Sequence, residues 1–411
     1  MKNRNLYSGV LIIFTSVIAL AATPADILKS AWKDPRIEAH NSAVDLAVDA
    51  HSYNLIEKFQ VIYRDGDSQW SDVKWGIKVY PKGLSEYRSS LRFQSAMEEN
   101  EKAAHKEALS KLLSERYDLL ARMTRVKEEK SISEQLLDVS RRASKALSYA
   151  AQNDRNELRS YLKSKTEFEK LSLKIAEMER DYKNMQDELA NQSFGTLDEF
   201  NPAGMVDISE IRKRVETGLP DPHQQTLSAK TAALSLEKTK AGIAFAKATD
   251  SRIVDSIEFV AKDSAAVPGD KSYGFQVAFN IPFFAADDLG RVDQATRELR
   301  EEARANEVLQ TSGRLFSNAM SELTVLLNLH KNFQMQGRQS NGQMKDTSKS
   351  LGATDPLLSL EMQREWYESR ENMLELEYSI RSLYISVLHE ASVIATNPEV
   401  NYFSKTMDKL L

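Results

Sequence analysis

The chain of 411 residues contains no cysteine, which excludes disulfide bonds, thiolate metal sites and a lipid anchor on a cysteine within these residues. It also has only 10 prolines and 15 glycines, although 28 % of its residues are charged. So few helix breakers favour extended helices over a compact α/β enzyme. The 55 basic and 60 acidic residues give a net charge of −5, so the sequence offers no electrostatic case for binding nucleic acid.

Signatures of catalysis and metal binding are also absent from the sequence. No HExxH, GxSxG, GxGxxG or Walker pattern occurs, and the six histidines never come within five residues of one another. Asp65 with Asp67, and Asp287 with Asp288, fit turns and helix N-caps better than metal ligands. We therefore expect a protein that is not an enzyme and that uses no cofactor and no metal.

The one long apolar run lies at the N-terminus. Basic "MKNRN" precedes apolar "LYSGVLIIFTSVIALA", and the small residues Ala19 and Ala21 fit a signal-peptide cleavage site. The run is short for a membrane helix, so a signal peptide is favoured over a membrane anchor, which is the alternative. No later segment reaches eighteen consecutive apolar residues, so any entry into a membrane would have to use strands.

Beyond the N-terminus, one series of elements is predicted twice. Asp34 and Asp221 each precede a proline, and proline is favoured at the first position of a helix. Each helix leads to two strand-like patches, a long helix, a short break and a return helix, at a displacement of roughly 190–200 residues. The strands are predicted at 59–64, 73–81, 252–263 and 272–282, the long helices at 83–150 and 287–349, and the return helices at 155–191 and 357–395.

These signals divide the chain into five parts. A linker with a small helix at 207–216 separates the repeats, and the linker and the tail both follow a return helix. We therefore expect both at the same level along the helical body. The parts are a signal peptide at 1–21, a first structural repeat at 22–192 with its β-hairpin at 59–80, an equatorial linker at 193–220, a second structural repeat at 221–396 with its hairpin at 252–281, and a C-terminal tail at 397–411.

The long helices carry the apolar spacing of a coiled coil, with steps that alternate between three and four residues. At 1.5 Å per residue, a helix of about sixty residues reaches roughly 90 Å, which no globular core requires. We therefore expect a helical rod. One stretch of this seam comprises Ile132, Leu136, Val139, Ala143, Ala146 and Ala150.

The predicted strands alternate apolar with polar residues, which is typical of a transmembrane β-barrel. Four strands at the end of a rod would leave open edges, and closure with copies from other chains would remove them. A soluble sheet packed on a helix is the alternative, and "FQVIYR" is short for a membrane span. The predicted lipid-facing residues are Trp75, Ile77, Val79, Tyr273, Phe275, Val277, Phe279 and Ile281, and the predicted interior residues are Lys74, Gly76, Lys78, Gly274, Gln276 and Asn280.

Nearly all of the mature chain resembles the TolC-like outer-membrane efflux channel family. The resemblance rests on the Asp-Pro helix starts, on "YGFQVAFNIPFF" and on "LGATDPLLSLEMQ". It implies a mainly α fold with a small β part, in which long antiparallel coiled-coil helices form an α-barrel tunnel. Four strands per chain would then contribute to a trimeric twelve-stranded transmembrane β-barrel, which Pro282 would leave for the tunnel.

The resemblance also implies location, partners and function. The homotrimer would lie in the outer membrane of a Gram-negative envelope, in contact with lipid, with its helical part in the periplasm. It would act as a passive duct of a tripartite efflux or type I secretion system, with a periplasmic adaptor (membrane fusion) protein and an inner-membrane transporter. The alternative function is a periplasmic coiled-coil adaptor or scaffold that forms no pore.

Some features depart from the family pattern. The first helical tip, "LSYAAQNDRNEL", lacks a glycine, "FFAADD" replaces a glycine-rich stretch, and Gly83 and Gly337 interrupt the long helices. The resemblance places a periplasmic gate at the two tips. Glu361 would face the lumen, where a ring of carboxylates favours cations, or would be a surface residue that pairs with Arg364. The candidate gate residues are Asn153, Asp154, Gly352, Asp355, Pro356 and Glu361.

Overall fold

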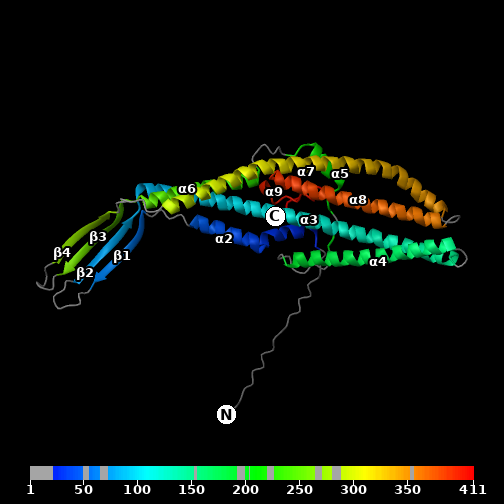
Figure 1. Cartoon of the computed structure of the whole chain (residues 1–411), viewed down its shortest axis with the longest axis horizontal. Coiled ribbons are helices and arrows are strands. Elements are labelled where there is room, and N and C mark those ends of the chain that lie inside the picture. Colours follow the sequence, from blue (N-terminus) through cyan, green and yellow to red (C-terminus); the bar gives the residue numbers. More distant parts are fainter. Residues whose placement is uncertain are drawn as a thin grey trace, which may run out of the picture.

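The computed structural model is an elongated molecule with a small sheet at one end and long helices over the remainder (Figure 1). Two of its helices, α3 (Leu84–Ala150) and α7 (Asp288–Leu351), have 67 and 64 residues. Each is therefore about 100 Å long. The structure describes residues 22–49, 55–64, 73–151, 155–191, 200–202, 204–219, 226–263, 271–279, 288–351 and 356–411.

Apart from α1, η1 and α9, which the sequence did not predict, the other elements follow the predicted order. The helices α1 (Pro24–Lys29), η1 (Ser30–Lys33, a 3-10 helix) and α2 (Pro35–Asp49) precede the first hairpin, β1 (Ile56–Arg64) and β2 (Val73–Pro81). The helix α4 (Arg155–Leu189) returns from α3, and α5 (Ile208–Glu216) lies in the linker. The second series is α6 (Leu227–Asp250), β3 (Val254–Asp263), β4 (Lys271–Phe279), α7, α8 (Pro356–Glu390) and α9 (Val393–Thr396).

Local capping fixes where the helices begin. The backbone N–H of Arg36 donates to Oδ1 of Asp34 at 3.0 Å, so the predicted Asp-Pro start of α2 is confirmed. The prediction that glycines interrupt the long helices is wrong. Gly83 is the N-cap of α3, where its N–H donates to Glu86 at 3.2 Å, and α7 continues through Gly337. The predicted Asp221 start lies outside the described residues, and α6 begins after the N-cap Thr226.

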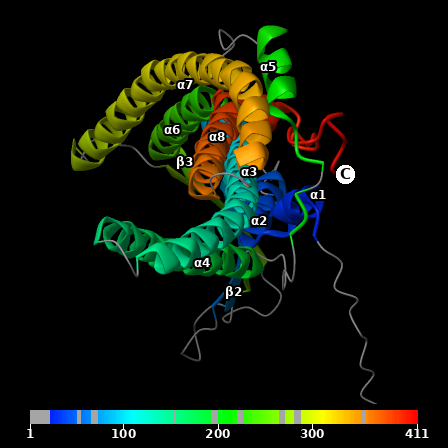
Figure 2. The same ribbon diagram turned by 90° about the vertical axis from the view of Figure 1, so that its right-hand side faces the viewer.

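The helices form an open arc around the long axis of the molecule. In the half nearest the sheet they pack in the order α2, α3, α6, α7, and in the other half in the order α4, α3, α8, α7. Figure 2 shows α7 and α4 at opposite ends of this arc, with α8 and α3 between them. One edge of the helical layer is therefore α2 and α4, and the other edge is α7.

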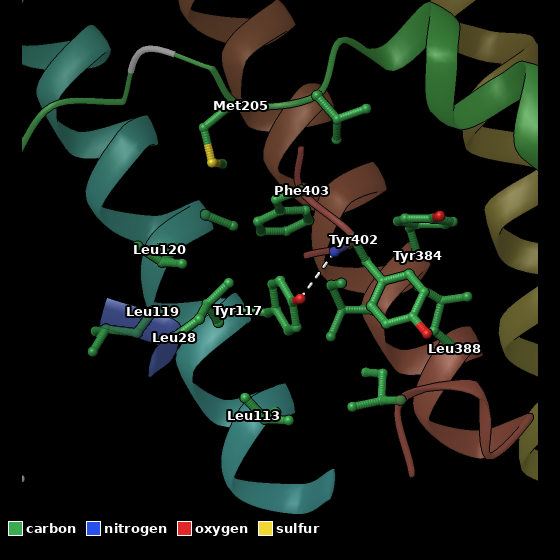
Figure 3. Close-up of a cluster of buried hydrophobic side chains, with 14 of the residues drawn as sticks. Leu28, Leu113, Tyr117, Leu119, Leu120, Met205, Tyr384, Leu388, Tyr402 and Phe403 are labelled. Atoms are coloured by element: carbon green, nitrogen blue, oxygen red, sulfur yellow. Dashed lines mark hydrogen bonds between the residues drawn. The ribbon is translucent and has the colours of Figure 1, made fainter. Parts of the chain in front are cut away.

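The largest core lies midway along the rod, where the linker and the tail meet α3 and α8 (Figure 3). The Tyr117 hydroxyl accepts from the backbone N–H of Tyr402 at 2.9 Å and donates to the Val400 carbonyl at 3.0 Å. The N–H of Val206 donates to the Phe403 carbonyl at 2.7 Å. The expectation that linker and tail share one level is therefore confirmed.

Candidate functional site

The sheet has the order β1-β2-β3-β4, and all of its neighbouring strands are antiparallel. Because alternate residues point to opposite faces, the register gathers apolar residues of all four strands on one face. The apolar rows are Phe59–Val79–Ile257–Val277, Val61–Ile77–Phe259–Phe275 and Tyr63–Trp75–Ala261–Tyr273.

This apolar face is exposed in the single chain. Trp75 is 62 % exposed, Phe275 is 61 % exposed and Tyr273 is 80 % exposed. An uncovered surface of this kind indicates a membrane or protein contact. Seven of the eight residues predicted to face lipid lie on this face. Phe279 lies at the helical end of the sheet, opposite Val254. The eighth residue, Ile281, lies outside the described residues.

The first strand is longer than the sequence predicts. The strand β1 begins at Ile56 and has nine residues, three more than the predicted "FQVIYR", because Lys58 pairs with Tyr80 and Ile56 with Pro81 across a bulge. Its apolar residues Phe59 and Val61, with Phe259 of β3, also belong to the apolar face. The spacing of Phe59, Val61 and Tyr63 at every second position of the sequence is the signal that places the first strand's apolar residues on one face.

The opposite face of the sheet carries mainly polar residues, with two glycines and the apolar Ile62 and Val260 in its middle row. Gly76 approaches its neighbour so closely that an added Cβ would lie 2.4 Å from the Phe259 carbonyl oxygen. At Gly274 the nearest atom to an added Cβ is the Val260 carbonyl oxygen, at 3.9 Å. The rows on this face are Gln60–Lys78–Glu258–Gln276, Ile62–Gly76–Val260–Gly274 and Arg64–Lys74–Lys262–Ser272.

One arginine joins the sheet to the helices. The guanidinium of Arg252, just before β3, donates to Glu86 of α3 at 2.8 Å and pairs with Glu57 of β1 at 2.6 Å. The hydrogen bond to Glu86 raises the pKa of Arg252, with a smaller contribution from Glu57. Because Glu86 also caps α3 through Gly83, this cluster sets the orientation of the sheet on the rod.

The helical tips at the far end of the rod are only partly described. Asn153, Asp154, Gly352 and Asp355 lie outside the described residues, and Pro356 is the first residue of α8. Glu361 is exposed on α8. Its predicted surface partner, Arg364, instead pairs with Glu167 of α4 at 2.5 Å and with Glu368 at 2.7 Å.

A second ionic cluster ties α4 to α3 and α8. The Lys174 ammonium lies 3.0 Å from Glu129 of α3 and 2.9 Å from Glu371 of α8, and Ser133 donates to Glu371 at 2.8 Å. Burial disfavours the charge on Lys174, but the hydrogen bonds to the two carboxylates outweigh it and raise the pKa of Lys174. The cluster therefore holds the return helices together as one body.

Two kinds of feature are absent from the part of the chain that the structure describes. Among them, no group of three or more histidine, aspartate or glutamate side chains is placed to hold a metal ion. None of the helices that the structure describes combines the length and the apolar character of a membrane-spanning helix.

Comparison with solved structures then decides the fold. The chain is similar to the MtrE outer-membrane channel of Neisseria gonorrhoeae in its open state, with a TM-score of 0.69 and 14 % identity over 90 % of this chain and 88 % of that one. For the CmeC outer-membrane channel of Campylobacter jejuni the TM-score is 0.69 and the sequence identity 11 %, and the match covers 94 % of this chain and 87 % of that one. For the outer-membrane protein VceC of Vibrio cholerae the TM-score is 0.67 and the sequence identity 11 %, and the match covers 90 % of this chain and 95 % of that one.

The chain has the TolC-like fold of outer-membrane efflux channels. No protein-family model matches the chain, and no curated protein matches its sequence. The TolC-like likeness is therefore one of shape, since identities of 11–14 % leave few shared residues. The predicted fold class, long helices with four strands in each chain, is confirmed.

Proposed function

We propose that this protein is an outer-membrane channel, a passive duct formed by three copies of the chain. The observation that carries the proposal is the exposed apolar face, which extends over all four strands of a sheet with two open edges. A sheet of this kind is stable when lipid covers its face and further strands cover its edges.

The strand lengths support a membrane span. A transmembrane β-strand needs about 9–11 residues when it is tilted. The strands β1, β2 and β4 have nine residues each, and β3 has ten. The six residues of "FQVIYR" were short for a membrane span, whereas the nine residues of β1 are long enough. We propose that the predicted lipid-facing residues, Ile281 included, contact outer-membrane lipid.

The edges of the chain support assembly with further copies. The strand β1 and the helices α2 and α4 lie on one edge, and β4 and α7 lie on the other. A contact between unlike edges of identical chains closes into a ring when the rotation permits, and three copies would supply twelve strands. Both edges carry exposed apolar side chains that such a contact would cover: Leu46 and Val48 on α2, Leu158, Leu162 and Leu173 on α4, and Val292, Leu299, Leu309, Leu315, Val325, Leu329 and Phe333 on α7.

The remaining assignments belong to the same proposal. The signal peptide at 1–21 would direct export, and the two structural repeats, 22–192 and 221–396, would each supply one hairpin and one pair of tunnel helices. The helical part would lie in the periplasm, and the tips, with Glu361, would form a gate that meets a periplasmic adaptor and an inner-membrane transporter. The similarity to MtrE and CmeC, which are outer-membrane channels, supports the location in the outer membrane.

Cross-linking of the full chain tests the assembly. Because the chain has no cysteine, Val61→Cys in β1 can be combined with a single cysteine at Tyr273, Phe275 or Val277 in β4. Oxidation in isolated membranes is expected to join neighbouring chains for one of these pairs and to yield a species of three chains and none larger. Cross-linked dimers without trimers, or a detergent-free soluble monomer, would contradict the channel and favour a periplasmic adaptor or scaffold.

A further inference from the structure

The polar face of the sheet carries more basic than acidic residues. Lys58, Lys74 and Lys78 belong to this face, and Glu258 is the acidic residue of its described rows. The chain as a whole has a net charge of −5, so the basic excess is a local property of the sheet.

The basic residues come at two levels of the sheet. At the helical end, the ammonium groups of Lys58 and Lys78 lie 5.8 Å and 5.1 Å from the centroid of the Tyr80 ring, whose hydroxyl donates to Gln60 at 3.0 Å. At the opposite end, Lys74 is paired in register with a basic residue on each side, Arg64 of β1 and Lys262 of β3.

This arrangement is unfavourable for the sheet alone. Like charges directly opposite one another on neighbouring strands destabilise a sheet. None of the ion pairs within the described residues joins Lys58, Lys74 or Lys78 to a carboxylate, and Glu258 stands opposite Lys78 without such a pair. Within the described residues, the three lysines of this face therefore have no carboxylate paired with them.

We propose that the strand part of the channel selects for anions, so that the transported solutes are anionic. This inference rests on the proposed function, because only a closed ring of strands turns the polar face into the wall of a lumen. Threefold symmetry would then repeat the lysines of both levels around that lumen. Rings of lysine and arginine favour anions in pores, and low-dielectric walls strengthen their field.

The experiment measures the chloride-to-potassium permeability ratio of full-chain trimers in planar bilayers of phosphatidylcholine under a KCl gradient. We expect a ratio above one for the natural chain. The double variant Lys74→Glu with Lys78→Glu should lower the ratio several-fold, below one. Lys74→Gln with Lys78→Gln should lower it less, and Lys74→Arg with Lys78→Arg should retain it. The differences should shrink in 1 M salt, where the screening length falls to about 3 Å.

A matched control carries the same change of charge away from the sheet. Lys405 and Lys409 lie in the tail, with side chains 61 % and 72 % exposed, and their double change to glutamate should leave the ratio unchanged. Conducting trimers whose ratio is the same in the natural chain and in both the Lys→Glu and the Lys→Gln variants would overturn anion selection while retaining the channel. A natural chain that forms no pore would overturn the proposed function, and anion selection with it.

Discussion

Replacing Gly76 with alanine tests the closest backbone approach in the sheet. The new Cβ would lie 2.4 Å from the Phe259 carbonyl oxygen, whereas ordinary contact begins at 3.4 Å. The obstructing atom belongs to the backbone of β3, so no side chain can rotate away. The central strands β2 and β3 would have to separate locally by about 1 Å, which breaks hydrogen bonds of ordinary length between them.

The expected magnitude follows from three contributions. Overpacking costs about 1–3 kcal/mol, and each weakened backbone hydrogen bond costs about 0.5–1.5 kcal/mol. Alanine in place of glycine offsets about 0.4–1 kcal/mol of this loss, because it lowers the conformational entropy of the unfolded chain. With one weakened hydrogen bond, we therefore expect each chain of the Gly76→Ala variant to lose about 0.5–4 kcal/mol of stability.

Gly274→Ala is the matched control, because Gly274 lies in the same row and the nearest atom to its added Cβ is 3.9 Å away. This variant should be neutral or slightly more stable than the natural chain. The measurement is the guanidinium midpoint at which detergent-solubilised trimers dissociate, with the yield of trimer as a second readout. Equal midpoints for the two variants would refute the register on which the assigned faces of the sheet depend.

Three further predictions address lipid contact, the gate and pH. Phe275→Arg places a charge on the apolar face, which should cost roughly 2–4 kcal/mol at mid-membrane. The membrane-assembled trimer of this variant should therefore be depleted in a fractionation assay, whereas Gln276→Arg on the opposite face should assemble. Equal yields of the two variants would contradict the assigned faces. Glu361→Lys should raise the chloride-to-potassium permeability ratio in single-channel recordings if three copies face the lumen, because it removes a ring of carboxylates, and an unchanged ratio in a correctly assembled trimer would remove Glu361 from the gate. The hydrogen bond from Lys238, at 2.8 Å, lowers the pKa of Glu101 below its ordinary 4.5, so the pair stabilises the fold fully above pH 4.5 and loses this contribution as the pH falls through the folded pKa. Thermal unfolding of Glu101→Gln should accordingly show a weaker pH dependence below 4.5 than the natural chain, and an identical dependence would contradict a role for Glu101.

The sequence predicted those features that depend on neighbouring residues. The start of α2 follows from Asp34 and Pro35, and the strand β4 follows from alternation over nine residues. Both signals are local, because a cap or an apolar face is set by residues within a few positions of one another.

The features that the sequence did not predict depend on contacts between distant residues. The strand β1 begins before the predicted residue 59 and includes the charged Glu57, which pairs with Arg252, almost half the chain away. Asp34 was predicted only as the residue before the first proline of a helix, but its carboxylate also pairs with Arg116 of α3, which is fully buried. No spacing in a single sequence reveals such partners, because the fold brings them together.

The two ionic clusters at Arg252 and Lys174 explain how a thin rod can hold the base of the sheet and the return helices in fixed positions. An isolated surface ion pair contributes little, but a shared cation that bonds two carboxylates on different elements restrains both of them. Arg252 restrains the base of the sheet, and Lys174 restrains α4 against α3 and α8. The described contacts leave the outer edges α2, α4 and α7 of the arc without a comparable clamp to one another, and in the proposed channel other copies of the chain would close the arc. Assembly would therefore complete the tunnel and the sheet in a single step, since the same edges carry both.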